Sequence, residues 1–348
     1  MSAVLSEAMW ASHATGTSTP VLAMVPGSQP LISIRGLTVA FDNGITQVPV
    51  LHGVDLDIRR GEAVGIVGES GCGKSVTWLA VLGLLGSKAR IGGSVYLDQK
   101  PIHQLTGDQL APIRGKRIAM IFQDPASALN PVHSIGKQLL EALHLHRGLR
   151  GQAAHAEALR LLDRVHIPNP AQRLSTYPHE LSGGTNQRVM IAMALAGEPD
   201  MLVADEPTTA LDATIQAQIL QLLAEIRRDS QMAMALISHD LGVIAEVSDR
   251  VLVMYAGRVV EQSSVRQLFD RARHPYTRGL LAALPDLTGP RRPLMTIPGS
   301  VPEPGRLPSG CSFRARCLQA DAHCAAGVPA ELEVDQGHRV ACLQSVGA

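Results

Sequence analysis

Residues 68–75 read Gly-Glu-Ser-Gly-Cys-Gly-Lys-Ser, and this glycine-rich segment places the strongest constraint on the fold. It follows the apolar run 63–67, expected to be a buried strand, and precedes a helical pattern over 76–85. Glycines lack a Cβ, so their backbone N–H groups can approach phosphate oxygens closely, and the next helix presents its positive end. The order of strand, loop and helix is the context that a phosphate loop requires. We therefore expect an α/β fold that binds a nucleotide.

Individual roles follow from the chemistry of the loop. Lys74 is expected to reach the β- and γ-phosphates, and Ser75 to place its hydroxyl on Mg²⁺. The alternative is a chance glycine-rich turn, which a complete motif between a strand and a helix disfavours. The predicted ATP contacts in and beside the loop are Gly68, Glu69, Ser70, Gly71, Cys72, Gly73, Lys74, Ser75 and Val76.

Two acidic residues follow the apolar run 201–204. Asp205 ends this expected strand, where a carboxylate can hold Mg²⁺ through water, and Glu206 is the next residue. The alternative is a solvated acidic pair at a strand end. The Pro-Thr-Thr-Ala-Leu-Asp stretch over 207–212 makes that alternative less favourable.

A third motif, Leu-Ser-Gly-Gly over 181–184, is expected at the start of a helix. Ser182 and the glycine N–H groups there would form a second anion site. The three motifs, in this order and spacing, resemble those of ABC-type ATPases. In particular the chain resembles the nucleotide-binding subunit of dipeptide/oligopeptide (peptide/nickel) importers. The resemblance covers roughly residues 30–348. Val76 and the run 189–195 resemble the D-type member of the importer's two unlike ATPases.

The resemblance implies a P-loop NTPase core of RecA type, with an antiparallel β subdomain and a helical subdomain. It assigns Glu206 to the attacking water, and His239 to the γ-phosphate as the switch histidine. Gln123 matches the glutamine that senses Mg²⁺ and the water. Phe41 matches the aromatic residue that stacks on adenine. The Mg²⁺ set comprises Ser75, Gln123 and Asp205, and ATP and Mg²⁺ are the implied cofactors.

A second set of residues is implied to face the ATP of a partner subunit, in a head-to-tail dimer. This signature set is Leu181, Ser182, Gly183, Gly184 and Gln187. The D-loop residues Ala210, Leu211 and Asp212 are implied to contact the partner. The chain departs from the family at Thr185 and Asn186, where an arginine is missing, but the serine and the glycines are intact.

Composition limits the partners. Lys plus Arg and Asp plus Glu both number 31, so bulk charge gives no reason to bind nucleic acid or anionic lipid. No apolar run reaches the 18 residues needed to span a bilayer, and the N-terminus lacks the pattern of a signal peptide. We expect a peripheral protein at the cytoplasmic face of the inner membrane, bound there through permeases.

Three regions are expected along the chain. Residues 1–29, rich in small residues and proline, are expected to be a flexible extension. Residues 30–265 are the expected ATPase domain, with a helical subdomain at about 124–195. Residues 266–348 are the expected C-terminal domain, which contains four of the five cysteines.

Those four cysteines are Cys311, Cys317, Cys324 and Cys342. Two disulfides are disfavoured in a cytosolic chain, where clustered thiolates more often bind metal. The resemblance implies a 4Fe–4S cluster on the four thiols. A Zn²⁺ site and thiols without a metal remain as alternatives.

The function implied is an ATP-hydrolysing subunit that powers the uptake of di- and oligopeptides. Its implied partners are a second ATPase subunit in a heterodimer, two transmembrane permeases and an extracytoplasmic solute-binding protein. Importers of nickel or glutathione use related ATPases. A soluble ABC ATPase of DNA repair or translation is a separate alternative, disfavoured by the single motif set and zero net charge. A module that holds ATP without hydrolysing it is disfavoured by the presence of Glu206 and His239.

Overall fold

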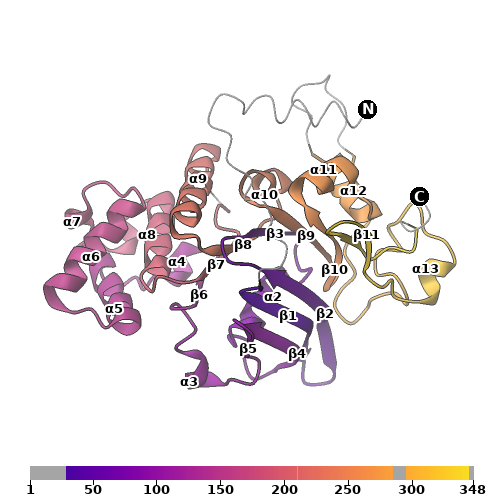
Figure 1. Cartoon of the computed structure of the whole chain (residues 1–348), viewed down its shortest axis with the longest axis horizontal. Coiled ribbons are helices and arrows are strands. Elements are labelled where there is room, and N and C mark those ends of the chain that lie inside the picture. The colour runs from indigo at the N-terminus through magenta and orange to yellow at the C-terminus, as the bar shows by residue number, and fades with distance from the viewer. Residues whose placement is uncertain (1–28, 210, 285–294, 345–348) are drawn as a thin grey trace.

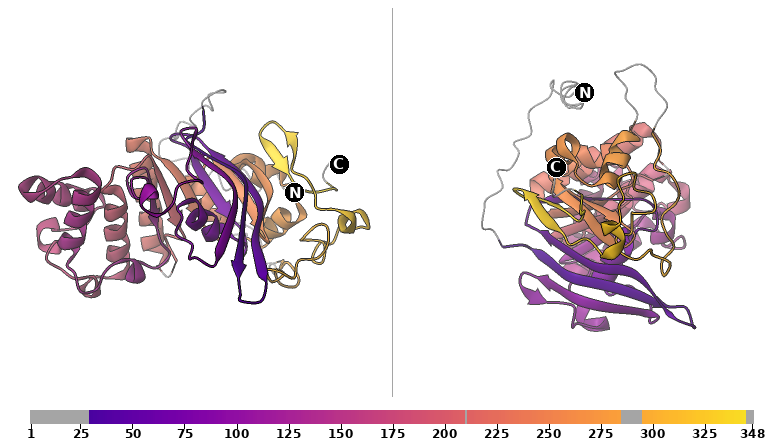
Figure 2. Two further views of the ribbon diagram at one scale, coloured as in Figure 1. Left: turned by 90° about the horizontal axis from the view of Figure 1, so that it is seen from below. Right: turned by 90° about the vertical axis from the view of Figure 1, so that its right-hand side faces the viewer.

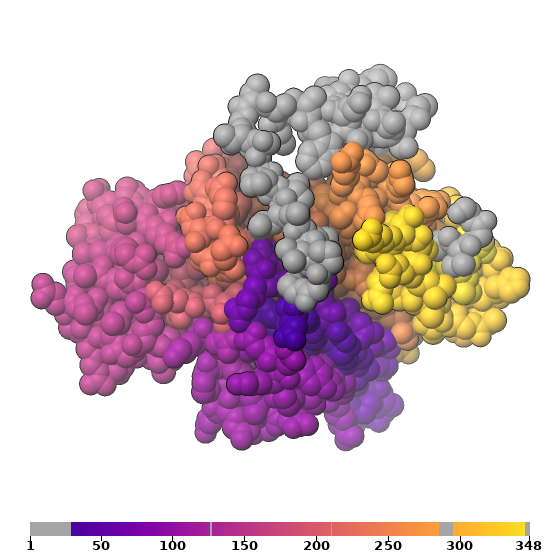
Figure 3. Space-filling model, viewed as in Figure 1, coloured from indigo at the N-terminus to yellow at the C-terminus, as the bar shows by residue number. Residues whose placement is uncertain are grey.

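The computed structural model describes residues 29–209, 211–284 and 295–344. A helical lobe lies at one end of the central body and the C-terminal segment lies at the opposite end (Figures 1, 2 and 3). Apart from residue 29, the extension expected over 1–29 lies outside the described residues, and so does Ala210. No helix among the described residues has the length and apolar character needed to cross a membrane.

The central body is built on a sheet of eight strands within the described ranges. In pairing order these are β11 (Leu332–Asp335), β12 (His338–Val340), β10 (Arg258–Ser264), β9 (Arg250–Tyr255), β3 (Ala63–Val67), β8 (Ala233–Ile237), β7 (Met201–Asp205) and β6 (Ile118–Ile121). The five strands from β9 to β6 run parallel. Strands β3, β7 and β8 are buried along their whole length, which explains their continuous apolar sequences.

A second, antiparallel sheet packs below the first in Figure 1. Its order is β2 (Gln47–Ile58), β1 (Ile32–Asp42), β4 (Ala89–Leu97) and β5 (Lys100–Pro101). Helix α2 (Lys74–Val81) follows the phosphate loop and buries Trp78 completely in the core shared by the two sheets. This helix ends before the predicted residue 85, because Gly83 takes φ 60° and closes the last turn. The short helix α3 (Gly107–Leu110) follows β5.

The segment predicted to be helical contains α4 (Pro125–Ala128), α5 (Ile135–Arg147), α6 (Gly151–Arg164), α7 (Pro170–Arg173), the 3₁₀ turn η1 (Pro178–Glu180) and α8 (Gly183–Leu195). Local signals set the bounds of α5. The Ser134 side chain accepts a hydrogen bond from the Lys137 N–H at its start, and Gly148 takes φ 68° at its end. Helices α9 (Ala213–Ser230) and α10 (Leu241–Val247) then return the chain to the sheet.

The C-terminal segment is joined to the core sheet. After α11 (Val265–Arg271), α12 (Pro275–Ala282) and α13 (His323–Ala326), strand β12 pairs with β10, and β11 pairs with β12. The separate module expected over 266–348 therefore extends the sheet of the ATPase core.

Burial of Glu261, in β10, would by itself raise the pKa of its carboxyl group. Hydrogen bonds from His338 and from the N–H groups of Arg273 and His274 outweigh it and keep the pKa low.

Glu261→Ala is expected to destabilise this junction strongly, because the buried His338 ring and the N–H groups of Arg273 and His274 would lose their acceptor. The expected loss is about 3 kcal/mol of unfolding free energy, the upper end of the usual scale for leaving buried donors without an acceptor. Urea unfolding followed by circular dichroism measures it. Glu303→Ala, at a side chain that is 73% exposed, is the control and should have little effect. Equal midpoints for the two variants would contradict the assigned role of Glu261.

Candidate functional site

The phosphate loop connects β3 to α2 through backbone that only glycine accommodates well. Gly68 has φ 155°, and an added Cβ there would lie 2.2 Å from the Met254 carbonyl oxygen. Gly73 has φ 103°, and a Cβ there would meet the Leu51 side chain at 2.4 Å. Strain and lack of space therefore both fix glycine at these two positions.

Lys74, the lysine of the phosphate loop, is the first residue of α2. Lys74 is buried, and its ammonium group donates to the carbonyl oxygens of Gly68 (2.7 Å) and Glu69 (3.1 Å). The side chain thus lies across the loop, where an incoming phosphate would compete for the same donor. Burial raises the pKa of the Cys72 thiol more than the neighbouring Lys74 lowers it, so Cys72 stays neutral. Ser70 and Gly71 form the exposed tip of the loop.

Asp205 reaches the loop from the end of β7. It is buried, and Ser75 hydrogen-bonds to its carboxylate. Burial and the adjacent charge of Glu206 raise the pKa of Asp205, whereas Ser75 and Lys74 act in the opposite direction. A hydroxyl and a carboxylate side by side are the oxygen ligands that Mg²⁺ prefers. The residues present therefore fit the metal ion that the sequence predicts.

Three polar side chains lie within 3.5 Å of one carboxylate oxygen of Glu206. Its Oε2 accepts hydrogen bonds from Gln123 Nε2 at 3.1 Å and Thr209 Oγ1 at 2.8 Å. The Nδ1 atom of His239 lies 3.5 Å from the same oxygen. Glu206 itself has φ 47°, a strained backbone conformation of the kind found at functional sites.

Gln123, Glu206 and His239 were predicted from the sequence, and the structure brings them together. Thr209 was missed, because a threonine in a turn gives no signal of its own. Only its position three residues after Glu206 could have indicated a contact between the two side chains.

The signature residues lie at the start of α8. Ser182 caps this helix, and its hydroxyl accepts the Thr185 N–H at 3.3 Å. A Cβ at Gly184 would lie 2.7 Å from the Ile215 side chain, so α8 packs closely against the first turn of α9. Asp212 caps α9 through the Ile215 N–H.

The remaining predicted contacts differ in exposure. Gln187 is 2% exposed, so its side chain lies inside the protein and not on the surface that a partner would meet. Leu211 is partly buried and packs near Gly183. Phe41, near the end of β1, and Val76, in α2, are partly buried against the core.

Comparison with known proteins decides the family. A family model described as "ABC transporter" matches residues 51–209. Another, "Oligopeptide/dipeptide transporter, C-terminal region", matches residues 260–324. The oligopeptide transport ATP-binding protein OppD of Escherichia coli is 45% identical over 316 residues, which cover 91% of this chain and 94% of OppD. A Brucella melitensis protein named for peptide import and ATP binding is 50% identical over 296 residues, with 85% and 89% covered.

The chain belongs to the ATP-binding subunits of ABC transporters, in the oligopeptide/dipeptide branch. Among solved structures, it is similar to a dimeric ATP-binding cassette in a post-hydrolysis state bound to ADP and Pi. The TM-score is 0.61 and the identity 29%, and the match covers 68% of this chain and 99% of that one. The ABC ATPase fold predicted from the sequence is thereby confirmed.

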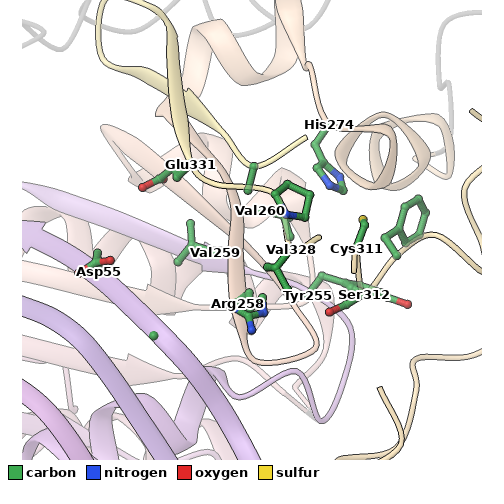
Figure 4. Close-up of a pocket in the computed structure, with 14 residues that line it drawn as sticks. Asp55, Tyr255, Arg258, Val259, Val260, His274, Cys311, Ser312, Val328 and Glu331 are labelled. Atoms are coloured by element: carbon green, nitrogen blue, oxygen red, sulfur yellow. The ribbon is translucent and has the colours of Figure 1, made fainter. Parts of the chain in front are cut away.

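Cys311 of this ABC subunit lines a cavity between the core sheet and the C-terminal segment (Figure 4). The cavity measures about 170 Å³, and Cys311 lines it together with Tyr255, Arg258, His274 and others. Burial lowers the pKa of His274 to about 4, so its ring is neutral.

The four thiols do not form a metal site in this structure. Among the described residues, which include all four cysteines, no group of three or more Cys, His, Asp or Glu side chains is placed to hold a metal ion. Burial, supported by the neighbouring thiols, raises the pKa of Cys311 and of Cys317, which favours protonated thiols. The 4Fe–4S cluster and the Zn²⁺ site expected from the sequence therefore receive no support from the arrangement of these thiols.

Gly73→Ala is expected to weaken nucleotide binding about tenfold or more, because the left-handed backbone and the contact with Leu51 would force the loop to move. Equilibrium binding of a fluorescent ATP analogue measures the change. Gly86→Ala is the control, since a Cβ there meets nothing within 4 Å. Equal affinity in the two variants would show that the loop tolerates a side chain at Gly73.

Proposed function

We propose that this protein binds and hydrolyses ATP to power the uptake of di- and oligopeptides by an ABC importer. The observation that carries the proposal is the convergence of Gln123, Thr209 and His239 on the carboxylate of Glu206. The phosphate loop and Asp205 supply the adjoining nucleotide site.

Binding begins at the loop. Lys74 exchanges the carbonyl oxygens of Gly68 and Glu69 for phosphate oxygens, and the backbone N–H groups around Gly71 and Gly73 face the phosphates. Ser75 and Asp205 are the residues that would hold Mg²⁺. When bound, this ion neutralises charge that develops on the phosphates.

Glu206 orients and polarises the attacking water. Thr209 holds the carboxylate in place, because its hydroxyl donates a hydrogen bond to Oε2. His239 is 66% exposed in its side chain and lies close enough to Glu206 to meet a γ-phosphate as well. Gln123 connects this group to the helical lobe that begins at α4, so the presence of the nucleotide is communicated to that lobe.

The second half of each site is proposed to come from a partner subunit. Ser182, Gly183 and Gly184 present a helix N-terminus, with Asp212 and Leu211 beside them. The similar cassette bound to ADP and Pi is described as dimeric, which supports this arrangement. We propose that the partner is a second, unlike ATPase subunit, so that ATP binding closes a heterodimer.

Closure of the dimer is proposed to do work on two membrane permeases that are docked near Gln123 and the helical lobe. A solute-binding protein outside the membrane would deliver the peptide. The protein would then lie at the cytoplasmic face of the inner membrane, held there by the permeases. The name of the OppD relative, which states oligopeptide transport, supports peptides as the solute.

Glu206→Gln is expected to reduce ATP turnover by about 10²- to 10⁴-fold and to leave ATP binding intact, because the amide cannot act as a base. Steady-state phosphate release and equilibrium nucleotide binding measure the two effects separately. Glu246→Gln, at an exposed acid of α10, is the control and should turn over like the wild type. Unchanged turnover in Glu206→Gln would remove this carboxylate from the mechanism.

A deletion strain is expected to lose the uptake of labelled di- and oligopeptides and to recover it with the wild-type gene but not with Glu206→Gln. Uptake of Ni²⁺ is measured in the same cells as the competing assignment. Peptide uptake that persists in a strain without other peptide importers would contradict the proposed solute.

A further inference from the structure

Glu69, the second residue of the phosphate loop, is bound by the C-terminal segment. Arg316 Nη1 donates to both carboxylate oxygens of Glu69, at 2.9 and 3.1 Å. These residues are 247 positions apart in the sequence. The Arg316 side chain is 6% exposed and the Glu69 side chain 30% exposed, so water screens the pair only in part.

Arg316 is fixed in place by the rest of its surroundings. Its Nε donates to the Pro298 carbonyl oxygen at 2.8 Å, and its Nη2 donates to the carbonyl oxygens of Ile297 and Gly299. The guanidinium also lies 5.8 Å from the centre of the Tyr255 ring, within the range of a cation–π contact. A planar donor held on all sides is a rigid partner for a carboxylate.

The backbone of Glu69 is held by the same part of the chain. Its N–H donates to the hydroxyl oxygen of Tyr276 at 2.9 Å. Tyr276 is completely buried, and burial raises its pKa far above the ordinary value, so the hydroxyl stays neutral. Residue 69 is therefore held at its side chain by Arg316 and at its backbone by Tyr276 of α12.

The charge of Glu69 presents a problem for a phosphate site. An ionised carboxylate within the phosphate loop repels a triphosphate, and the repulsion is stronger where water is excluded. The carbonyl oxygen of Glu69 also accepts a hydrogen bond from Lys74, so a displaced Glu69 would move the lysine that binds the phosphates. A fixed cation on the carboxylate neutralises the charge that would repel the triphosphate. It also holds Glu69 in place, so Lys74 is not displaced.

We propose that Arg316 is a positioning residue for ATP binding: its ion pair with Glu69 neutralises the acidic residue of the phosphate loop, so that the C-terminal segment sets the affinity for MgATP. This inference rests on the proposed ATPase function. Arg316 would thus act on the nucleotide site although it lies outside the phosphate-loop motif.

The test compares Arg316→Gln with Arg306→Gln in the full-length protein assembled with its permeases. Arg306 belongs to the same segment, but its side chain is 81% exposed and pairs with the exposed Glu303. Arg316→Gln is expected to raise the KM for MgATP about tenfold, with kcat changed less than about threefold. Added salt should reverse part of the rise, because it screens the unpaired Glu69. Arg306→Gln should match the wild type.

The double variant Arg316→Gln/Glu69→Gln isolates the charge. It is expected to return the KM to within about threefold of the wild type, because no carboxylate is left to repel the phosphates. A KM for Arg316→Gln equal to that of Arg306→Gln would overturn the proposal. A double variant with a KM no lower than that of Arg316→Gln would overturn it too.

The single variant Glu69→Gln tests the proposal even where Arg316→Gln fails to fold. Its KM is expected to be no higher than that of the wild type and up to about threefold lower, since the loop loses a negative charge and keeps a cation. A tenfold rise would show that the loop needs the carboxylate itself, contrary to the proposal. Wild-type protein that fails to bind MgATP would instead refute the proposed function, so the two failures are distinguishable.

Discussion

The parallel strands of the central sheet are the constraint on which the site depends. Parallel strands align their carboxyl ends along one edge, where ligands of open α/β sheets bind. Four segments leave this edge: the phosphate loop after β3, Gln123 after β6, Asp205 and Glu206 at the end of β7, and His239 after β8. Complete burial of β3, β7 and β8 makes this edge rigid. Residues separated by more than a hundred positions thereby meet at one carboxylate.

The helical lobe and the C-terminal segment are connected to this edge of the sheet by contacts of different strength. Gln123, directly before the lobe, touches Glu206 through a single hydrogen bond donated by its own exposed side chain, a contact that can open and close. The C-terminal segment is joined more firmly, through the pairing of β10 with β12 and the buried Glu261 network. One lobe is therefore suited to move with the nucleotide, and the other to hold the phosphate loop in a fixed shape.

Most of the core and its motifs could be predicted from the sequence. The buried parallel strands read as short apolar runs, and the phosphate loop, the Asp205–Glu206 strand end and the Ser182 helix cap have local patterns that tertiary contacts do not override. Strand β4 was not predicted, because Gly92 and Gly93 interrupt its alternation and a close approach to β1 supplies what local preference lacks. The end of α2 was predicted too late, since Gly83 closes the helix.

The sequence by itself determined which residues we propose for the nucleotide chemistry, because those motifs are contiguous and depend on local backbone geometry. Only the tertiary structure decided the rest. It joined the C-terminal segment to the core sheet, turned Gln187 inward and placed Arg316 and Tyr276 on Glu69. It also left the four neighbouring thiols, all within the described residues, without an arrangement that could hold a metal ion. Each of these depends on side chains far apart in the sequence, and long-range packing leaves no periodic or local trace from which such contacts could be predicted.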